Sequence, residues 1–427
     1  MSKRLSHSKK AQNPQANATG AGGGSQPAAT AAAGKKQSSK EQELHHTKEE
    51  ASAQLSHRLN CPLFALSLST RTKGRSVKEN NAEEELFLCV GGGGGPGRTG
   101  VGNVLAFYKV DGGGALLPWF QHDMGEEAVY HLQLHPKEAC LLCSVGTSAC
   151  RVYSFDKNNG GNVELQNEFQ TDFAESDSEQ KIVIFNREGD RAATAGTDGV
   201  IRVWQWPSCK QVKLKHTMDA YSTSGAAVTA LDYSPDGTML ASISSEGDAM
   251  LRVWNATTGQ CVQEALPPGY NKGLRFRGCL FSPDENHMFT AQTKGRSDSF
   301  ITKWRRQEDS WIPCKTSLAH KRLKGACTAL AVSPNGEYVA TGTAEGELAI
   351  FRAKDLCWIF RKDVHGFFIS RLAFSPDSSL LFSTSGDYSV VATKVESTRG
   401  ILTQYGATLF WVVALLLLII AVLLFRA

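Results

Sequence analysis

The sequence predicts an all-β protein, a seven-bladed β-propeller followed by a single C-terminal transmembrane helix. Three observations predict it: a strand-and-turn unit that recurs along the chain, an aromatic residue that returns about every 50 residues, and a 19-residue uncharged segment near the C-terminus. With 41% hydrophobic and 21% charged residues over 427 positions, the composition is typical of a globular protein.

The recurring unit begins with an apolar strand that runs into the tripeptide Ser-Pro-Asp or Ser-Pro-Asn. Proline pre-sets its own φ and the Asx side chain bonds the local backbone, so each copy predicts a strand that ends in a tight turn. Copies lie at residues 231–237, 280–284, 330–336 and 372–377.

A third strand in each unit ends in an aromatic residue, and the successive intervals are 51, 50, 50 and 47 residues. The aromatic residues are Tyr153, Trp204, Trp254, Trp304 and Phe351. This period resembles the WD40 repeat, so we predict a WD40-type propeller in which His320 and His365 stabilise their blades. Seven blades close a ring without free edges, although six or eight remain compatible with the degenerate first and last units. The predicted blades are residues 61–120, 126–156, 181–214, 226–266, 274–313, 325–360 and 366–396, with 157–180 as a polar insertion.

Charge and cysteine usage exclude several classes of function. Residues 1–60 hold nine Lys/Arg against four Asp/Glu, while the rest of the chain is nearly neutral, so no nucleic-acid-binding surface is expected. The eleven cysteines are scattered, as in a reduced intracellular protein. Cys140 and Cys143 form one C-x-x-C motif, but it lies in an apolar strand, which favours core packing over zinc binding.

The two ends of the chain differ in character. Residues 1–40 contain twenty Ala, Gly or Ser, and this composition predicts a disordered low-complexity arm, which we extend to residues 1–57. From Ala407 to Phe425 the chain is uncharged and apolar on every face, and as a helix it would span roughly 28 Å. We therefore expect a propeller at residues 58–397, a linker at 398–406 and a membrane anchor at 407–425. The anchor is short, which favours the thin endoplasmic reticulum membrane, with the propeller in the cytosol.

One connection in the first unit breaks the repeat. Where the other units have a short turn, residues 91–102 contain eight glycines. Ordering so many glycines is costly, so the segment is either a flexible hairpin or a loop ordered by an ion or a partner. It nearly matches a phosphate-binding P-loop, but Arg98 replaces the lysine and a strand follows where a P-loop needs a helix. No catalytic constellation is found elsewhere, so the chain is not expected to be an enzyme.

The pattern of this loop resembles one family closely. A strand, four glycines (Gly92, Gly93, Gly94, Gly95), a basic residue, Thr99-Gly100, the aliphatic Val101 and Asn103 resemble the endoplasmic-reticulum guanine-nucleotide exchange factors for the Sar-type small GTPase. These are also called the prolactin regulatory element-binding protein family. The sequence departs from the family pattern at Arg98, where lysine is usual, and differs slightly at Gly91 and Val101.

The resemblance implies a function and a site. The chain would activate a Sar-type small GTPase at the endoplasmic reticulum membrane and so start assembly of the COPII coat. A potassium ion would be held by backbone carbonyls of residues 92–95. The loop, with Arg98, Thr99, Gly100 and Val101, would contact the GTPase, and Asn103 would project toward its nucleotide pocket and promote exchange. The alternatives are a membrane-tethered WD40 scaffold without exchange activity and, less favoured by the neutral body and the anchor, a nuclear regulatory protein.

Overall fold

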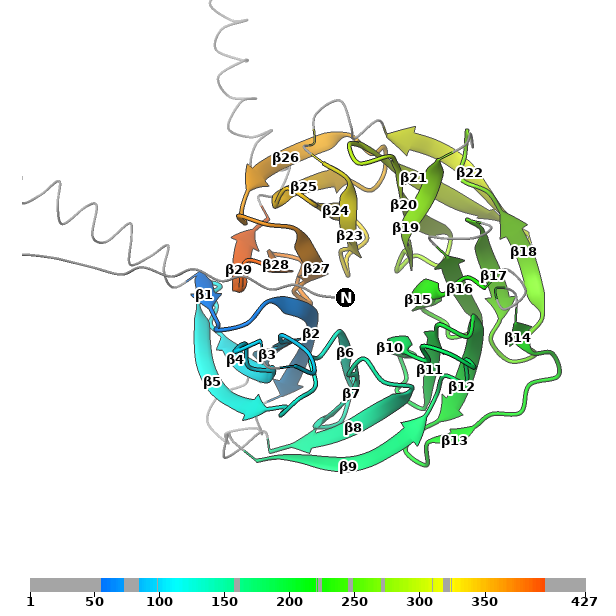
Figure 1. Ribbon diagram of the computed structural model, residues 1–427. Helices are drawn as coiled ribbons and strands as arrows, with labels where there is room; N and C mark the ends of the chain where they lie inside the picture. The colour runs from blue at the N-terminus through cyan, green and yellow to red at the C-terminus, as the bar shows by residue number, and fades with distance from the viewer. Residues whose placement is uncertain are drawn as a thin grey trace, which may run out of the picture. The chain divides into compact units, whose positions relative to one another are not determined.

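The computed structural model describes residues 55–395, apart from residues 73–83, 98, 157–161, 220, 222–224, 245–248, 270–272, 309, 318–322 and 324. Within these residues the chain forms strands β1 to β29 and no helix. The strands make seven antiparallel sheets arranged as blades around a central axis (Figure 1). The predicted seven-bladed, all-β propeller is confirmed.

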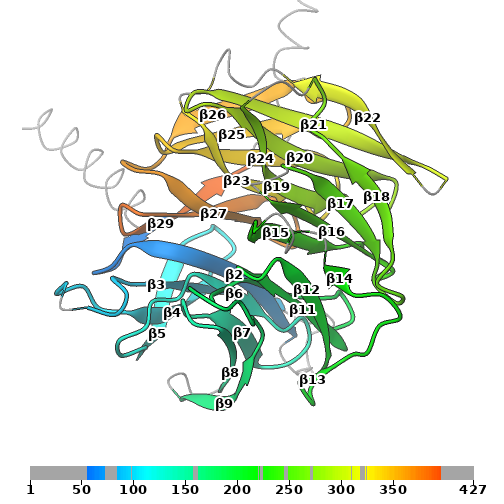
Figure 2. The ribbon, with the colours of Figure 1, turned by 45° about the vertical axis from the view of Figure 1, so that its right-hand side comes forward.

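Each blade is an antiparallel meander whose first strand lies nearest the axis and whose fourth lies at the rim, an order that can be followed in the turned view of Figure 2. Blade 1 contains β2 (Leu63–Thr72), β3 (Glu84–Gly92), β4 (Val104–Val110) and β5 (Leu116–Asp123). Blade 2 contains β6 (His131–Leu134), β7 (Cys140–Ser144), β8 (Ala149–Phe155) and β9 (Val163–Gln170). Blade 3 contains β10 (Gln180–Phe185), β11 (Arg191–Gly196), β12 (Val200–Gln205), β13 (Lys210–Gln211) and the short β14 (Met218–Asp219), which also pairs with β12.

The remaining blades follow the same plan. Blade 4 contains β15 (Val228–Tyr233), β16 (Met239–Ser244), β17 (Leu251–Asn255) and β18 (Cys261–Ala265). Blade 5 contains β19 (Leu274–Phe281), β20 (His287–Lys294), β21 (Asp298–Gln307) and β22 (Ser310–Ser317). Blade 6 contains β23 (Cys327–Val332), β24 (Tyr338–Thr343), β25 (Glu347–Arg352) and β26 (Trp358–Asp363). Blade 7 contains β27 (Ile369–Phe374), β28 (Leu380–Ser385), β29 (Ser389–Lys394) and β1 (Ser56–Arg58).

The Ser-Pro-Asx turns join the first and second strands of their blades. In blade 4 the Ser234 hydroxyl accepts a hydrogen bond from the Met239 amide at 2.9 Å, and Asp236 Oδ1 accepts one from the Thr238 amide at 3.0 Å. Ser375 and Asp377 repeat this pattern in blade 7. The serine and the Asx side chain therefore fix the register at which the second strand starts.

The periodic aromatic residues are buried in the third strands. The indole N–H groups of Trp204, Trp254 and Trp304 each donate a 2.8 Å hydrogen bond to a Thr or Ser hydroxyl on the neighbouring second strand. Each indole thus packs in the core with its one polar group satisfied. Cys140 and Cys143 are buried in β7 as free thiols, which confirms core packing for the C-x-x-C motif.

His365 stabilises blade 7, as predicted. Its Nε2 lies 2.8 Å from the Ser383 hydroxyl, and its Nδ1 lies 2.8 Å from the Ser389 hydroxyl and 3.3 Å from Asp387 Oδ1. Burial lowers the pKa of His365, although Asp387 acts in the opposite direction. His320 lies outside the described residues.

The ring is closed by a strand that the sequence analysis did not find. β1 pairs with β29 and supplies the outer strand of blade 7, so the N-terminal and C-terminal segments of the propeller share one sheet. The Ser370 hydroxyl adds a 2.6 Å hydrogen bond to the carbonyl oxygen of Leu63 in blade 1.

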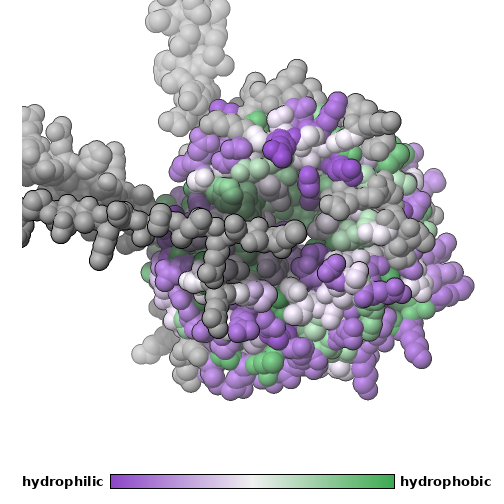
Figure 3. Space-filling view, viewed as in Figure 1, coloured by the Kyte–Doolittle hydropathy of each residue, from purple (hydrophilic) through white to green (hydrophobic). Residues whose placement is uncertain are grey.

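The prediction of a polar insertion at residues 157–180 was wrong for part of that range. Val163–Gln170 is β9, the outer strand of blade 2, and it pairs with β8 along seven residue positions. Most of its side chains are exposed, so it carries no apolar alternation. Polar residues cover most of the rim in Figure 3, and large exposed apolar side chains such as Leu117, Leu165 and Ile312 are scattered on outer strands.

Among the described residues, none belongs to a helix long and apolar enough to cross a membrane. The predicted span from Ala407 to Phe425, the linker at 398–406 and nearly all of the N-terminal arm lie outside the described residues.

Candidate functional site

The glycine-rich loop joins β3 to β4 in blade 1. Because strands alternate in direction, all connections between second and third strands emerge on one face, together with the connections from each outer strand to the next inner strand. We call this the loop face. Residues 93–103, all described except residue 98, form the longest connection between a second and a third strand on this face; the equivalent turn of blade 3 spans residues 197–199.

Two glycines at the base of the loop are required by close packing. A Cβ on Gly92 would lie 1.9 Å from the carbonyl oxygen of Pro62, and one on Gly93 would lie 1.9 Å from Asn103 Oδ1. Gly93 also has a φ of +150°, and its amide donates a 3.0 Å hydrogen bond to the Pro62 carbonyl. The base of the loop is therefore packed closely against the segment between β1 and β2, and no side chain fits there.

Asn103 holds the loop from within. Its side chain is only 4% exposed. Oδ1 accepts a 3.0 Å hydrogen bond from the Gly95 amide, and Nδ2 donates one of 2.8 Å to the carbonyl oxygen of Gly125. The Asn103 carbonyl also accepts a hydrogen bond from the Met124 amide. In this structure the amide does not project from the surface; it joins the glycine loop to the connection between blades 1 and 2.

The tip of the loop is exposed. Thr99, Gly100 and Gly102 face solvent, and the Thr99 hydroxyl accepts a 3.3 Å hydrogen bond from the Val101 amide. Val101 is half-buried and, with Thr99, folds back over Gly94, where a Cβ would lie 2.6 Å from Thr99 Oγ1. Arg98 lies outside the described residues. The loop thus has a fixed base and an accessible tip.

The base of the loop offers ligands of the kind that potassium takes, namely backbone carbonyl oxygens. Among the hydrogen bonds of the described residues, none is accepted by the carbonyl oxygens of Gly93, Gly94 or Gly95. The donor type therefore fits a monovalent cation.

A second group of metal-ligating side chains fits a metal poorly. His135, Glu138 and Cys140 bring their ligand atoms within 4.8 Å of one another on the opposite face. Both ring nitrogens of His135 are already used, because Nε2 lies 2.9 Å from the Gly189 carbonyl and Nδ1 accepts from the Glu138 amide. Glu138 in turn accepts from the indole of Trp206. Hydrogen bonds within blade 2 and from blade 2 to blade 3 account for this cluster.

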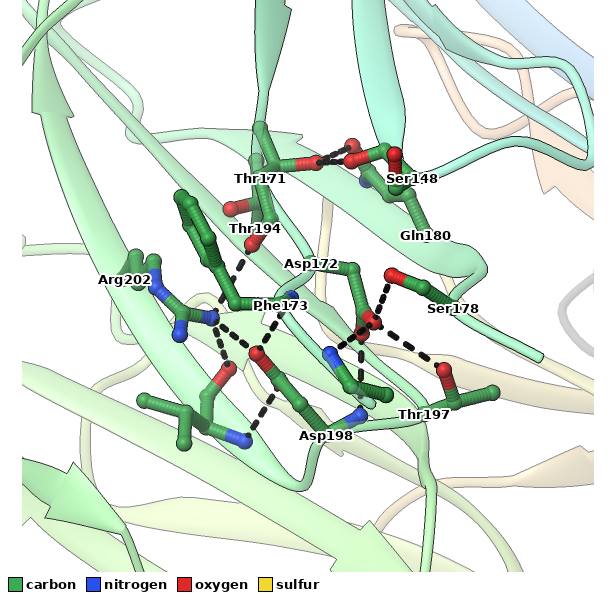
Figure 4. A network of polar contacts seen from close by, with 12 residues as sticks. Ser148, Thr171, Asp172, Phe173, Ser178, Gln180, Thr194, Thr197, Asp198 and Arg202 are labelled. Atoms are coloured by element: carbon green, nitrogen blue, oxygen red, sulfur yellow. Dashed lines mark hydrogen bonds and ion pairs between the residues drawn. The ribbon is translucent and has the colours of Figure 1, made fainter. Parts of the chain in front are cut away.

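The loop face also carries a dense polar network between blades 2 and 3 (Figure 4). Asp172 is fully buried and accepts hydrogen bonds from four groups, namely the Asp198 and Ala174 amides and the Ser178 and Thr197 hydroxyls. Burial alone would raise the pKa of Asp172, but these hydrogen bonds outweigh it and lower the pKa. Sequence reasoning missed this network, and the only signal was the turn at residues 197–199.

The network holds one exposed aromatic side chain in place. Asp198 accepts from the Phe173 amide at 2.9 Å and pairs with Arg202 at 2.7 Å. The Arg202 guanidinium lies 4.7 Å from the centre of the Phe173 ring, which is 52% exposed. The loop face therefore combines the glycine loop with at least one pre-ordered apolar side chain.

Comparison with known proteins agrees with the fold. The WD domain, G-beta repeat family matches residues 212–255, 312–352 and 359–391, which begin in blade 3 and end in blade 7. The chain is 28% identical over 316 residues to SEC12-like protein 2 of Arabidopsis thaliana, covering 70% of this chain and 74% of that protein. It is 24% identical over 377 residues to the guanine nucleotide-exchange factor SEC12 of Mus musculus, covering 75% and 83%.

A more distant relative shares less of the chain. Eukaryotic translation initiation factor 3 subunit I of Emericella nidulans is 26% identical over 51% of this chain. The similarity to Sec12-named proteins extends over most of the chain, and it confirms the resemblance predicted from the glycine loop.

Proposed function

We propose that this chain is a guanine-nucleotide exchange factor for a Sar-type small GTPase. The observation that carries the proposal is the glycine loop, which has a fixed base and an exposed tip on one face of the propeller. The chain that contains this loop is similar in sequence to Sec12-named exchange factors. Such a protein regulates a GTPase and performs no covalent chemistry of its own.

The mechanism is a population shift. A factor that binds the nucleotide-free GTPase more tightly than the GDP-bound form lowers the affinity for GDP by that same ratio. The rigid propeller face would hold the GTPase while the tip of the loop, with Arg98, Thr99 and Gly100, enters the surroundings of the nucleotide phosphates. Pre-ordering of the loop lowers the entropy that binding must otherwise overcome.

Asn103 promotes exchange in this proposal by positioning the loop. Its two side-chain hydrogen bonds fix Gly95 relative to Gly125, and the tip follows from that base. A potassium ion on the carbonyl oxygens of Gly92, Gly93, Gly94 and Gly95 would add a charge that further orders the base.

The remaining assignments concern location. Ala407 to Phe425 would anchor the chain in the endoplasmic reticulum membrane with the propeller, residues 58–397, in the cytosol. Activated GTPase would then recruit the COPII coat at that membrane. Asn255 begins an Asn-Ala-Thr sequon at the end of β17, and it should carry no glycan in this topology.

Release of fluorescent GDP from a Sar-type GTPase tests the proposal. The purified full chain should accelerate release at catalytic concentrations, and acceleration should weaken when potassium is replaced by a large organic cation at equal ionic strength. Binding of the GTPase without acceleration would instead identify a membrane-tethered WD40 scaffold. Equal rates of GDP release in both salts would show that exchange does not depend on a bound potassium ion.

A further inference from the structure

The mouth of the central channel contains a pocket of about 550 Å³. Most of its lining comes from the first half of the innermost strands or from residues just before them, including Phe64 of β2, Tyr130 before β6, Arg277 of β19 and Arg371 of β27. These strands surround the axis in Figure 1. Because the inner strands begin at the loop face, the pocket opens beside the glycine loop, and the Tyr130 hydroxyl lies 3.4 Å from the Cβ position of Gly95.

The charge of this pocket is unbalanced. Arg277 and Arg371 line it, and among the described residues none of those lining it is an Asp or Glu. Among the ion pairs of the described residues, neither guanidinium takes part in one. Two uncompensated positive charges in a concave site favour an anion that carries two negative charges.

Arg371 has most of its donors available. It is half-buried, and its one hydrogen bond within the described part of the chain is a long 3.4 Å contact from Nη1 to the Ser370 carbonyl. Burial lowers the pKa of the guanidinium, the direction expected where no nearby carboxylate offsets the loss of solvent. A guanidinium has five N–H donors in a planar fork, whose geometry matches phosphate and carboxylate oxygens.

The pocket also has a buried histidine beside it and an aromatic pair in its lining. Beside Arg371, His131 has a buried Nδ1 with no hydrogen-bond partner among the described residues, and burial together with the charge of Arg371 lowers the pKa of its imidazole. The rings of Phe64 and Tyr130, which also line the pocket, stack at 5.5 Å between centroids. The pocket is larger than one phosphate group needs and falls within the size range of small-molecule sites.

We propose that the channel mouth binds a small phosphorylated molecule, with its phosphate on Arg371 and Arg277 and its organic part against Phe64 and Tyr130. Arg277 is oriented for this by the 3.0 Å hydrogen bond from its Nε to the Thr293 hydroxyl. The site is separate from the exchange mechanism and needs no GTPase.

Calorimetric titration of the full chain, purified in detergent, tests the proposal with inorganic phosphate and with phenyl phosphate at constant ionic strength. Phosphate should bind saturably where chloride does not, and phenyl phosphate should bind more tightly because of the aromatic wall. Arg371→Gln should raise the Kd for phosphate at least ten-fold, which corresponds to about 1.4 kcal/mol, and Arg277→Gln should raise it several-fold.

Two controls keep the result interpretable. Arg187→Gln removes an exposed arginine in the turn between β10 and β11, on the opposite face, and should leave binding unchanged. Arg371→Lys keeps the charge without the fork and should give an intermediate loss, and a near-UV circular dichroism spectrum checks that each variant is folded. An unchanged Kd in folded Arg371→Gln, phosphate binding no better than chloride, or phenyl phosphate binding no better than phosphate would overturn the assignment.

Discussion

Blades 1 and 3 make the same connection between their second and third strands in opposite ways. Blade 3 uses a turn of residues 197–199, which is held by side chains, because Asp172 alone accepts four hydrogen bonds around it. Blade 1 uses a long loop whose base is held mainly by close backbone packing and by the two side-chain hydrogen bonds of Asn103.

The two connections contribute differently: the blade 3 network stabilises the fold, and the blade 1 loop serves the proposed exchange function. A network of buried hydrogen bonds that share the acceptor Asp172 stabilises the ring, and losing that acceptor is costly to folding. A glycine loop leaves its backbone accessible and depends on few contacts, so its conformation can be lost while the propeller remains folded. Substitutions in the two blades should therefore affect folding and exchange separately.

Asp172→Ala should destabilise the protein by about 3 kcal/mol, because it leaves several buried donors without an acceptor. The midpoint of urea unfolding measures this loss. The folded variant should still accelerate GDP release, and a specific loss of exchange with unchanged stability would reverse the roles given to the two blades.

Asn103→Ala should reduce the rate of stimulated GDP release at least ten-fold, or about 1.4 kcal/mol. The substitution leaves the Gly95 amide and the Gly125 carbonyl without their hydrogen-bond partner, so we expect the free energy of unfolding to fall by about 1 kcal/mol. Faster hydrogen exchange at residues 93–97 should show that the loss is local. A variant that melts far below the wild type would mean that the first blade is damaged as a whole.

Two glycine substitutions form a matched pair in the loop. Gly93→Ala places a methyl group against Asn103 Oδ1 at an unfavourable φ, and it should impair exchange nearly as much as Asn103→Ala. Gly100→Ala meets open space at a φ of +73°, so it should cost about 1 kcal/mol locally and change exchange by less than about three-fold. Equal effects of the two substitutions would argue against a fixed base with an independent tip.

Asp232 in blade 4 contrasts with Asp172, because few hydrogen-bond donors reach its carboxyl group. Burial raises its pKa to about 7 in the folded protein, although the Phe281 amide donates to it at 2.7 Å. The folded state therefore holds a proton that the unfolded state has released, and stability falls as the pH rises from about 4 to 7. The free energy of unfolding of Asp232→Asn, relative to that of the wild type, should rise by on the order of 1 kcal/mol between pH 5 and pH 8. This value is reduced for partial solvent exposure. A difference in unfolding free energy between the variant and the wild type that is the same at pH 5 and pH 8 would contradict the raised pKa.

The sequence predicted the features that depend on local patterns. The Ser-Pro-Asx turns and periodic aromatic residues revealed the blades, and the run of glycines revealed the unusual loop. β1 was missed because three residues carry no periodic signal, and β9 was missed because its exposed side chains lack alternation. The inward direction of Asn103 and the placement of Arg277 and Arg371 along one pocket depend on how distant segments pack, which no local pattern records.

Replacing residues 93–102 with the tripeptide Thr-Asp-Gly, the turn of blade 3, tests the central claim most directly. We expect a folded propeller that melts within a few degrees of the wild type and no longer accelerates GDP release from a Sar-type GTPase. Release at the wild-type rate by this short-loop variant would contradict the account, because exchange would then come from another part of the loop face.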